Sequence, residues 1–397
     1  MFNSSKKVRC VFPIFLLIIF YLMSFIVKNC GLEQMAYTET VVSKQQEQQQ
    51  RYDAKLHWTQ VKQPDISQNG TDIEWSYDSL KNKLIFRVNN SYGTNVTALP
   101  NYFPFGNDEK PWKEHLKKEN IEVEIREGIT SVGSSCFMIP QVNAKIQPKT
   151  KIKKVSLPSS LQKIGSVAFA HNEAMEYLEI PDAVTKIDNL AFCNNVALKK
   201  VRLSNNLQHL GVMAFSGCCV LEKVIIPDSL KKIAAFAFQN CSSLEEVILP
   251  TTLKEIGHAA FAFCTKLSKI KFPQSLEKIE SVAFRNCISL KKITIPSGVK
   301  YLGTQYEKGG GFAGCFHNCK RLQKITVYKP KDGINIYQPQ SNPKEGVMYL
   351  FTGAPSGKIN FMGSKDDFER TDWNEFNLRS KVFGYDEYPK WQTIYTE

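Results

Sequence analysis

Basic side chains recur at a fixed spacing through the middle of this 397-residue chain. Lys200, Lys223, Lys269 and Lys292 are separated by 23 or 46 residues, and two of them are followed two residues later by another base. Ammonium and guanidinium groups bind carboxylates, sulfates and phosphates, so the pattern predicts electrostatic capture of an anion. The candidate contact residues are Lys154, Tyr177, Lys200, Arg202, Lys223, Lys269, Lys271, Lys292 and Lys324.

The sequence gives little support for catalysis. It contains no G-x-S-x-G nucleophile motif and no H-E-x-x-H zinc motif, and residues 353–358 resemble a phosphate-binding loop only loosely. The histidines fall at unrelated positions of the repeat, and we interpret His171, His209 and His258 as turn residues. We therefore expect no catalytic residue and no cofactor. An enzyme whose site lies in residues 52–120 or 329–397 is the rival hypothesis.

Eleven cysteines raise the question of disulfides or a metal site. Five of them occupy one repeat position, which predicts a stack of buried free thiols, because free cysteine packs as a small apolar residue. A metal ladder is the alternative, although the column lacks histidine and carboxylate partners and no C-x2-C pair exists. Disulfides within Cys218-Cys219 or between Cys315 and Cys319 also stay open. The five stacked positions are Cys218, Cys241, Cys264, Cys287 and Cys319.

The basic residues belong to a repeating unit that has to position them. Prolines close the units on a period of 23 residues, and Ala-Phe pairs recur with the same period. Such a period is typical of a solenoid, in which each unit buries its apolar face against its neighbours. The prolines are Pro158, Pro181, Pro227, Pro250, Pro273 and Pro296, with Ser204 at the missing position. The phenylalanines are Phe169, Phe192, Phe215, Phe238, Phe261 and Phe284.

Each unit contains one short strand. The alternation in residues 244–249 predicts that Leu244, Val247 and Leu249 point inward, whereas Glu246 and Ile248 point outward. Proline stops each strand, and the phenylalanines form an internal ladder. The fold class is therefore a mainly β repeat solenoid with short extended segments. Since adjacent strands lie about 4.8 Å apart, the basic residues would line up on a concave sheet.

The unit L-P-x-x-L-x-x-I-G-x-x-A-F-x-x-C-x-x-L-x-x-V-x-I resembles the BspA-like (Treponema-type) leucine-rich repeat. The resemblance extends from about Trp75 to Asp386 and implies a surface or secreted binding protein, often linked to adhesion. The family has no shared catalytic residues. This chain departs from the pattern at Ser204, at Asn172 and Asn195 in place of cysteine, and at two insertions. The insertions cover residues 138–151 and 304–311, which we interpret as rim loops.

The first residues of the chain predict export. Basic residues precede an apolar run over residues 11–27, which is short for a spanning helix and long for a signal-peptide core. A membrane anchor, a cleaved signal and a lipoprotein with Cys30 as its acylated residue are all compatible with this segment. In each case the repeats lie outside.

These patterns divide the chain into six segments. They are residues 1–10 (basic cytoplasmic N-terminus), 11–27 (transmembrane signal anchor or signal peptide), 28–71 (polar stalk), 72–120 (N-terminal cap), 121–328 (solenoid) and 329–397 (C-terminal capping region).

The sequence thus predicts an exported, membrane-anchored, adhesin-like protein whose concave sheet binds a protein or an anionic polysaccharide. A structural scaffold of the cell envelope without a defined ligand is the alternative, and lysine used only for solubility is the simpler explanation of the basic pattern. The formal net charge of +13 would also suit binding to nucleic acid. The sequence contains no nucleic-acid-binding motif, however, so we do not expect nucleic acid as a partner.

Overall fold

The computed structural model describes residues 41–62, 70–92, 97–102, 110–139, 150–303, 314–328, 335–336, 357–366 and 391–396. The chain forms two compact units, residues 1–57 and residues 58–397. In the first, residues 41–53 are helical within the segment expected to be an unfolded stalk. Pairs four residues apart support this polar helix, with Arg51 on Glu47 and Gln49 on Asp53.

The second unit begins with a hairpin and a parallel extension. β1 (Thr59–Lys62), β2 (Gly70–Asp78) and β3 (Lys83–Val88) are antiparallel, and β4 (Ile121–Ile125) and β6 (Ile152–Ser156) continue the sheet in parallel. The segment expected to be the N-terminal cap therefore contains a hairpin of β2 and β3, and β1 lies in the segment assigned to the stalk. The short helices are η1 (Asn90–Tyr92) and α2 (Lys113–Leu116).

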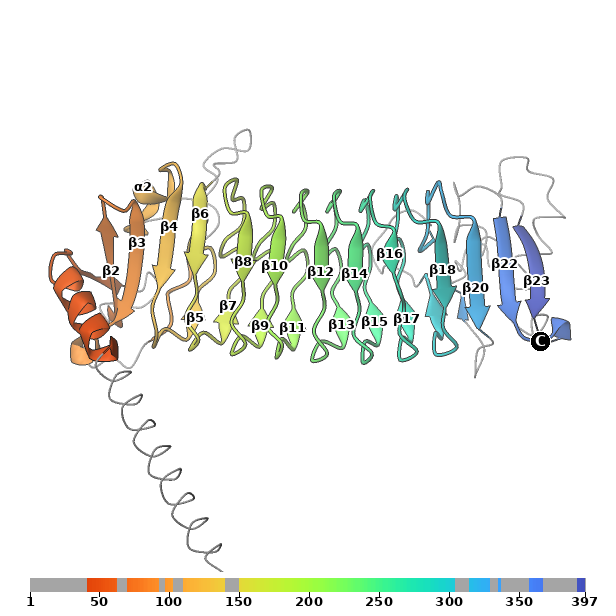
Figure 1. Ribbon diagram of the computed structural model, residues 1–397, viewed down its shortest axis with the longest axis horizontal. Helices are drawn as coiled ribbons and strands as arrows, with labels where there is room; N and C mark the ends of the chain where they lie inside the picture. Colours follow the sequence, from red (N-terminus) through yellow and green to blue (C-terminus); the bar gives the residue numbers. More distant parts are fainter. Residues whose placement is uncertain are drawn as a thin grey trace, which may run out of the picture. The chain divides into compact units, whose positions relative to one another are not determined.

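Each repeat then forms one coil with a strand on each of two sides (Figure 1). The first side, called the main sheet below, carries β8 (Tyr177–Glu179), β10 (Lys200–Arg202), β12 (Lys223–Ile225), β14 (Glu246–Ile248), β16 (Lys269–Ile270), β18 (Lys292–Ile295), β20 (Lys324–Tyr328), β22 (Gly357–Met362) and β23 (Trp391–Thr396). The hydrogen-bonded ladder runs from β8 to β16 and again from β18 to β23.

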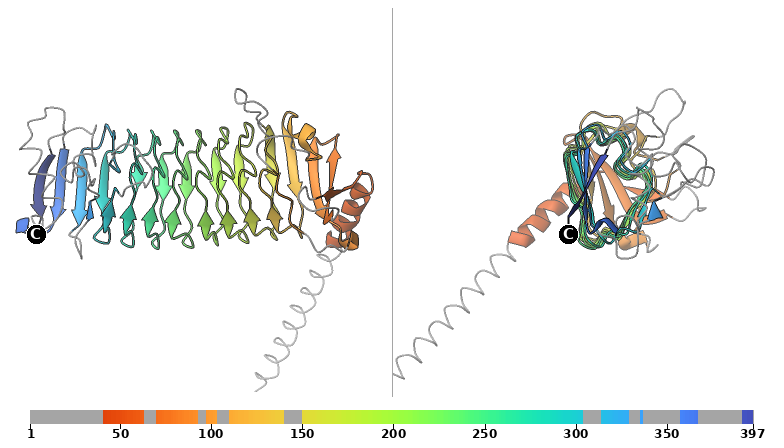
Figure 2. Two further views of the ribbon diagram at one scale, coloured as in Figure 1. Left: turned by 180° about the vertical axis from the view of Figure 1, so that it is seen from behind. Right: turned by 90° about the vertical axis from the view of Figure 1, so that its right-hand side faces the viewer.

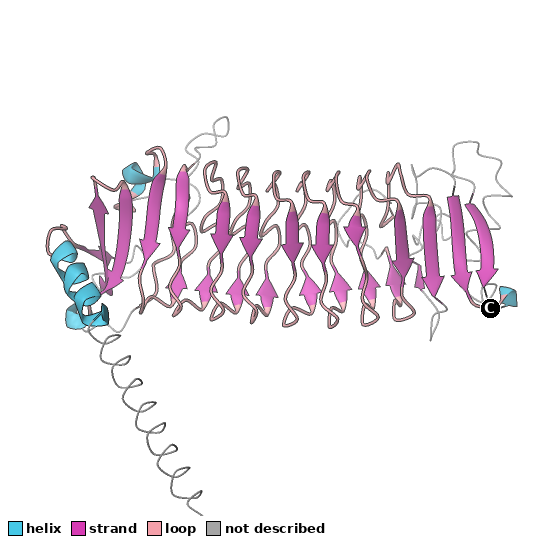
Figure 3. Cartoon of the chain, viewed as in Figure 1, coloured by secondary structure: helices cyan, strands magenta, loops and turns pink. Residues whose placement is uncertain are grey.

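Two-residue strands stack in parallel on the other side, called the second row below (Figure 3). They are β5 (Ser131–Val132), β7 (Lys163–Ile164), β9 (Lys186–Ile187), β11 (His209–Leu210), β13 (Lys232–Ile233), β15 (Glu255–Ile256), β17 (Lys278–Ile279), β19 (Tyr301–Leu302) and β21 (Asn335–Ile336). The short extended segments that the fold class predicts are therefore present.

The main sheet is nearly flat, which corrects the concave sheet expected from the sequence. In the end-on view the coils of the solenoid overlie one another closely (Figure 2). Curvature in a repeat protein needs one side of the coil to be thicker than the other, as when helices about 8–10 Å apart back strands about 4.8 Å apart. Here both sides are strands, so the two sides advance equally from coil to coil.

The phenylalanines form the internal ladder that the sequence predicts. The rings of Phe215 and Phe238 lie 5.7 Å apart between centroids, and those of Phe238 and Phe261 lie 5.6 Å apart, each pair within 3° of parallel. The ladder runs from Phe137 to Phe316, and its rings are fully buried. Because the centroid distances exceed the strand spacing of about 4.8 Å, the rings stack with an offset, which aromatic pairs favour.

The repeated cysteines are buried free thiols, as predicted, among the residues that the structure describes. Each thiol lies near the phenylalanine carbonyl of the preceding coil and donates to it, as Cys241 does to Phe215 O at 3.3 Å and Cys264 to Phe238 O at 3.2 Å. Burial raises the pKa of the Cys241 and Cys264 thiols well above the ordinary value. Asn172 fills the same position with a bond from its Nδ2 to Ile152 O at 2.8 Å.

Several predictions fall outside the described residues. They include most of the two insertions and much of the C-terminal capping region, and also the apolar segment 11–27. Within the described ranges, the structure has no helix with the length and apolarity that a membrane crossing requires.

Candidate functional site

The structure places the predicted contact residues on the outward face of adjoining coils. The parallel register aligns Tyr177 with Lys200, Lys200 with Lys223, and Lys223 with Glu246. Glu246 in turn is aligned with Lys269. Farther along, Lys292 is aligned with Lys324 and Lys324 with Lys358. These residues form one line across the strands, called the first column below.

A second column lies two residues farther along each strand. Arg202 is aligned with Glu179, Ile225 with Ile248, and Thr294 with Thr326. Ile225 and Ile248 are 57% and 40% exposed, so the middle of this column is apolar rather than basic. Lys154, at the N-terminal end of the first column, is aligned with Glu122 of β4.

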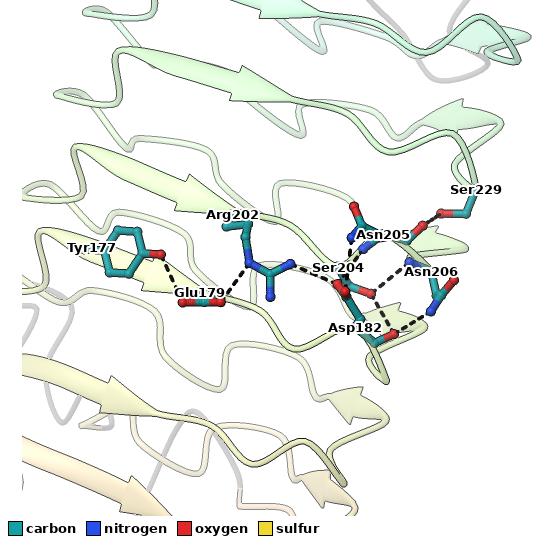
Figure 4. Close-up of polar contacts among 8 residues, drawn as sticks. All are labelled: Tyr177, Glu179, Asp182, Arg202, Ser204, Asn205, Asn206 and Ser229. Atoms are coloured by element: carbon teal, nitrogen blue, oxygen red, sulfur yellow. Dashed lines mark hydrogen bonds and ion pairs between the residues drawn. The ribbon is translucent and has the colours of Figure 1, made fainter. Parts of the chain in front are cut away.

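Arg202 is already neutralised by carboxylates of the preceding coil. Its Nε lies 2.9 Å from Glu179 Oε1 and its Nη1 lies 2.9 Å from Asp182 Oδ1 (Figure 4). Tyr177 donates its hydroxyl to the other oxygen of Glu179 at 3.1 Å. The backbone N–H of Asn205, and then the Arg202 guanidinium, lower the pKa of Asp182. An anionic ligand would have to displace these carboxylates to reach Arg202.

Ser204, the residue that interrupts the proline series, takes part in the same network. Its hydroxyl donates to Asp182 O at 3.2 Å and accepts from Asn206 N at 3.1 Å (Figure 4). Asn205 binds both carboxylate oxygens of Asp182, at 3.0 and 3.1 Å. The turn after β10 is therefore fixed by hydrogen bonds, whereas the turns after β6, β8, β12, β14, β16 and β18 begin with a proline ring.

Lys223 is paired as well. Its Nζ lies 2.9 Å from Glu246 Oε2, and the hydrogen bond from Lys223 lowers the pKa of that carboxyl, which the charge of Lys269 lowers further. The bases of the column that make no ion pair with any described residue are Lys154, Lys200, Lys269, Lys292, Lys324 and Lys358, together with Lys271 of the second column. The sequence reasoning missed Lys358, although Lys358-Ile-Asn-Phe repeats the strand pattern of β18 and β20.

Every lysine on a second-row strand has an acidic partner, and so does Lys254 just before β15, whereas Lys231 and Lys300 at the position of Lys254 make no ion pair with a described residue. Lys163 and Lys186 both lie 3.1 Å from Asp188, and Lys232 lies 2.8 Å from Glu255. Two further pairs are Lys254 with Glu277 at 2.6 Å and Lys278 with Glu280 at 2.7 Å. The two sides of the solenoid therefore differ in charge balance, not in their content of lysine alone.

The metal ladder considered from the sequence has no counterpart among the described residues. No group of three or more His, Cys, Asp or Glu residues is placed there to hold a metal ion. His209 lies on strand β11 and not in a turn, which corrects the expectation, whereas His171 and His258 lie in turns. Burial lowers the pKa of His258, whose ring packs against Phe236 at 5.0 Å.

Comparison with known families agrees with this geometry. The model of the BspA type leucine rich repeat region matches residues 117–245 and 231–338, in six copies. Together these ranges cover more than half of the 397 residues. The chain belongs to the BspA-type leucine-rich repeat family. None of the curated proteins matches it significantly.

Solved leucine-rich repeat structures from bacteria are similar to this member of the BspA-type family. A protein from Bacteroides ovatus shares 18% identity, with 81% of this chain and 98% of that chain covered and a TM-score of 0.45. The pneumococcal vaccine antigen PcpA shares 18% identity, with coverage of 85% and 100% and a TM-score of 0.38. A leucine rich cell surface protein from Faecalibacterium prausnitzii shares 19%, with coverage of 76% and 96% and a TM-score of 0.34.

Proposed function

We propose that this protein is a non-catalytic, adhesin-like binding protein that holds an anionic macromolecule on the outward face of its main sheet. The contrast between the two sides of the solenoid carries the proposal. Lysines of the second row have carboxylate partners, whereas Lys200, Lys269, Lys292 and Lys324 on the main sheet have none among the described residues. A bound anion would supply the missing counter-charge.

Lysine used only for solubility explains this contrast less well. Solubility requires exposed charge on both sides of the coil, and it gives no reason why every lysine on a second-row strand has an acidic partner while these four main-sheet lysines have none. Protection against edge-to-edge aggregation concerns edge strands, whereas β10, β12 and β20 lie inside their hydrogen-bonded ladders. Like charges in register on neighbouring strands are destabilising, so their presence calls for a function that offsets the loss.

The proposal includes display outside the cell, with residues 11–27 as a membrane anchor. The basic residues before this apolar run favour an N-terminus that stays inside, which leaves the repeats outside. Protease added to intact cells should degrade the repeats and spare the N-terminal peptide. Repeats that resist protease until the cells are lysed would contradict external display.

A binding experiment tests the ligand class. Full-length protein is passed over dextran sulfate, polyglutamate and neutral dextran at physiological ionic strength. We expect retention on at least one polyanion and none on neutral dextran. In a main-sheet variant, Lys200, Lys223, Lys269, Lys292 and Lys324 are replaced by Gln, and this variant should lose most of the retention.

A matched control removes the same number of charges from the other side of the coil, by replacing Lys163, Lys186, Lys232, Lys254 and Lys278 with Gln. Its retention should stay close to that of the wild type. Equal losses in the two variants would mean that net charge alone drives binding and would refute the proposal. Absence of retention on every polyanion, together with self-association, would favour an envelope scaffold instead.

A further inference from the structure

Charge is unevenly distributed along the main sheet. The strands β8 to β14, with the turn before each, are called the mixed half and comprise residues 172–181, 195–204, 218–227 and 241–250. They contain six acidic and four basic residues. The strands β16 to β22, called the basic half, comprise residues 264–273, 287–296, 319–328 and 357–362. They contain nine basic residues and no acidic one.

All nine bases of the basic half are exposed. They are Lys266, Lys269, Lys271, Lys291, Lys292, Lys320, Arg321, Lys324 and Lys358. None of them makes an ion pair with any residue that the structure describes. In the mixed half, by contrast, Lys199, Arg202 and Lys223 each have a carboxylate within 3.1 Å. Most of the unpaired bases of the main sheet therefore lie in the basic half, and Lys200 is the unpaired base of the mixed half among the described residues.

The geometry of the basic half suits a linear ligand. Lys292, Lys324 and Lys358 are directly aligned on neighbouring parallel strands. With strands about 4.8 Å apart, the line from Lys269 to Lys358 spans about 14 Å along the solenoid axis. A small anion would contact one or two amines on this flat, open surface. A polymer lying along the axis would contact all of them at once and gain affinity by multivalency.

The neighbouring side chains indicate the chemical class of the polymer. Beside the lysines run Thr294, Thr326 and Asn360, which are aligned in register and offer hydroxyl and amide groups. Protein interfaces usually need aromatic or apolar anchors in their centre. The most exposed isoleucines of the main-sheet strands, Ile225 and Ile248, lie in the mixed half, whereas the basic half exposes one isoleucine, Ile288, in the turn before β18. The basic half is thus a polar, cationic surface that matches a hydrated polyanion.

Single-stranded nucleic acid fits this surface less well than a glycan. Its binding sites combine a basic groove with aromatic side chains on which successive bases stack. The two columns of the basic half carry lysine, threonine and asparagine, and the exposed aromatic residue Tyr328 lies at the end of β20. Compact ammonium groups bind sulfate and phosphate as point charges, without the planar fork that carboxylates favour in arginine.

We propose that the basic half binds a linear polysaccharide bearing sulfate or phosphate groups, laid across strands β16 to β22 along the solenoid axis. This inference rests on the proposed function and narrows it to one half of the sheet and one class of ligand. Sulfate and phosphate esters share the required chemistry, so probes carrying each of them separate the two sources.

The first test measures the affinity of full-length protein for size-fractionated heparin oligosaccharides and for a phosphorylated dextran of matched charge. Affinity should rise by roughly 10²-fold from the disaccharide to lengths that reach from Lys269 to Lys358, and then level off. The probe that binds with the higher affinity shows whether the preferred ligand carries sulfate or phosphate esters. Affinity independent of length would overturn the linear-ligand inference while leaving anion binding by the main sheet intact.

The second test compares two variants that each lose four charges. The basic-half variant replaces Lys269, Lys292, Lys324 and Lys358 with Gln, and the mixed-half variant replaces Lys199, Lys200, Arg202 and Lys223 with Gln. The first should lose most of the heparin affinity and reduce the slope of log K against log salt by about 3, at roughly 0.7 per lost contact. The second should keep a near wild-type slope.

Three outcomes would separate the inference from the proposed function. Equal losses of heparin affinity in both variants would refute the assignment of the ligand to the basic half, while the main sheet as a whole would remain the binding face. No loss in either variant would refute both. Tighter binding of polyglutamate or of single-stranded DNA than of heparin, at equal charge, would refute the glycan assignment alone.

Discussion

Lys223 Nζ lies 2.9 Å from Glu246 Oε2, and this ion pair marks the boundary between two kinds of surface on one sheet. Before it, acids and bases alternate between coils and neutralise one another. After it, the ranges of the basic half contain nine basic residues and no acidic one. The repeat determines where an outward side chain lies on the sheet. The residue type at that position determines whether its charge is neutralised by a neighbouring coil or can bind a ligand.

The phenylalanine ladder should dominate the stability of the solenoid. Phe238→Ala removes a ring that is fully buried between Phe215 and Phe261, and should lower the free energy of unfolding by about 3–5 kcal/mol. Phe236→Ala, which removes a partly exposed ring from the turn, should cost only roughly 1 kcal/mol. Urea denaturation of both variants measures the difference. Equal losses would contradict the ladder as the main source of stability.

Substitutions of Ser204 compare a turn that is fixed by side-chain hydrogen bonds with a turn that begins with a proline ring. Ser204→Ala leaves Asn206 N without its partner and should cost about 1 kcal/mol. Ser204→Pro loses the same hydroxyl but restricts the unfolded chain, which is worth about 0.4–1 kcal/mol. The melting temperature of Ser204→Pro should therefore lie between those of Ser204→Ala and the wild type. A proline variant less stable than the alanine variant would show that the backbone at this position is incompatible with proline.

The sequence predicts the fold in detail because every coil repeats the same physical problem. Phe215, Phe238 and Phe261 stand 23 residues apart, and stacking identical coils puts identical side chains on top of one another. The inward and outward directions follow from the alternation of each strand, so Val247 is buried and Ile248 is 40% exposed. The concave sheet was the wrong expectation, because extended segments on both sides of the coil, which the repeat predicts, produce a flat sheet.

The candidate site could be predicted only in part. The lysine column is visible in the sequence, but the pairing of its members depends on side-chain directions in the preceding coil. Glu179, 23 residues before Arg202, could have been anticipated, whereas the reach of Asp182 across the turn could not. The pairing of β23 with β22 was missed because Trp391–Thr396 carries none of the repeat columns.

The buried thiols should be unreactive in the native protein. Burial raises the pKa of Cys218 and Cys241 well above the ordinary value, whereas Cys219 is only partly buried. Among the cysteines that the structure describes, Ellman's reagent at pH 8 should modify Cys219 first and leave Cys218 and Cys241 intact until denaturant is added. Peptide mapping of the labelled protein identifies the sites. Rapid labelling of Cys241 without denaturant would show that the coils open locally.

Mild acid should destabilise the solenoid through its histidines. Burial lowers the pKa of His258 below 6.5, and His115 and His317 behave in the same way. A lowered folded-state pKa means that the unfolded chain binds more protons, so stability is complete above about pH 6.5 and is lost as the pH falls through the folded-state value. Carboxylates with lowered pKa, such as Asp188 and Glu124, act below about pH 4.5, outside this window.

The melting temperature should therefore fall as the pH is lowered from 7.5 to 5. His258→Phe keeps an aromatic ring against Phe236 without a titrating group, and it should reduce this pH dependence. Leaving the pH dependence unchanged would show that His258 does not contribute. His209→Phe, at an exposed position of strand β11, is the matched control for a histidine-to-phenylalanine change.

Stability and binding should move in opposite directions at the first column. Lys324 stands in register between Lys292 and Lys358, so Lys324→Glu exchanges two like-charge neighbours for two opposite-charge neighbours. This should raise the free energy of unfolding by about 0.2–1 kcal/mol and weaken heparin binding.

The substitution Glu246→Lys should have the opposite effects, because it breaks the ion pair with Lys223 and extends the line of bases toward Lys200. It should lower the melting temperature and tighten heparin binding. Calorimetry and heparin titration of both variants would show whether the two properties are opposed. A Lys324→Glu variant that is more stable and binds heparin as well as the wild type would mean that these lysines serve no ligand.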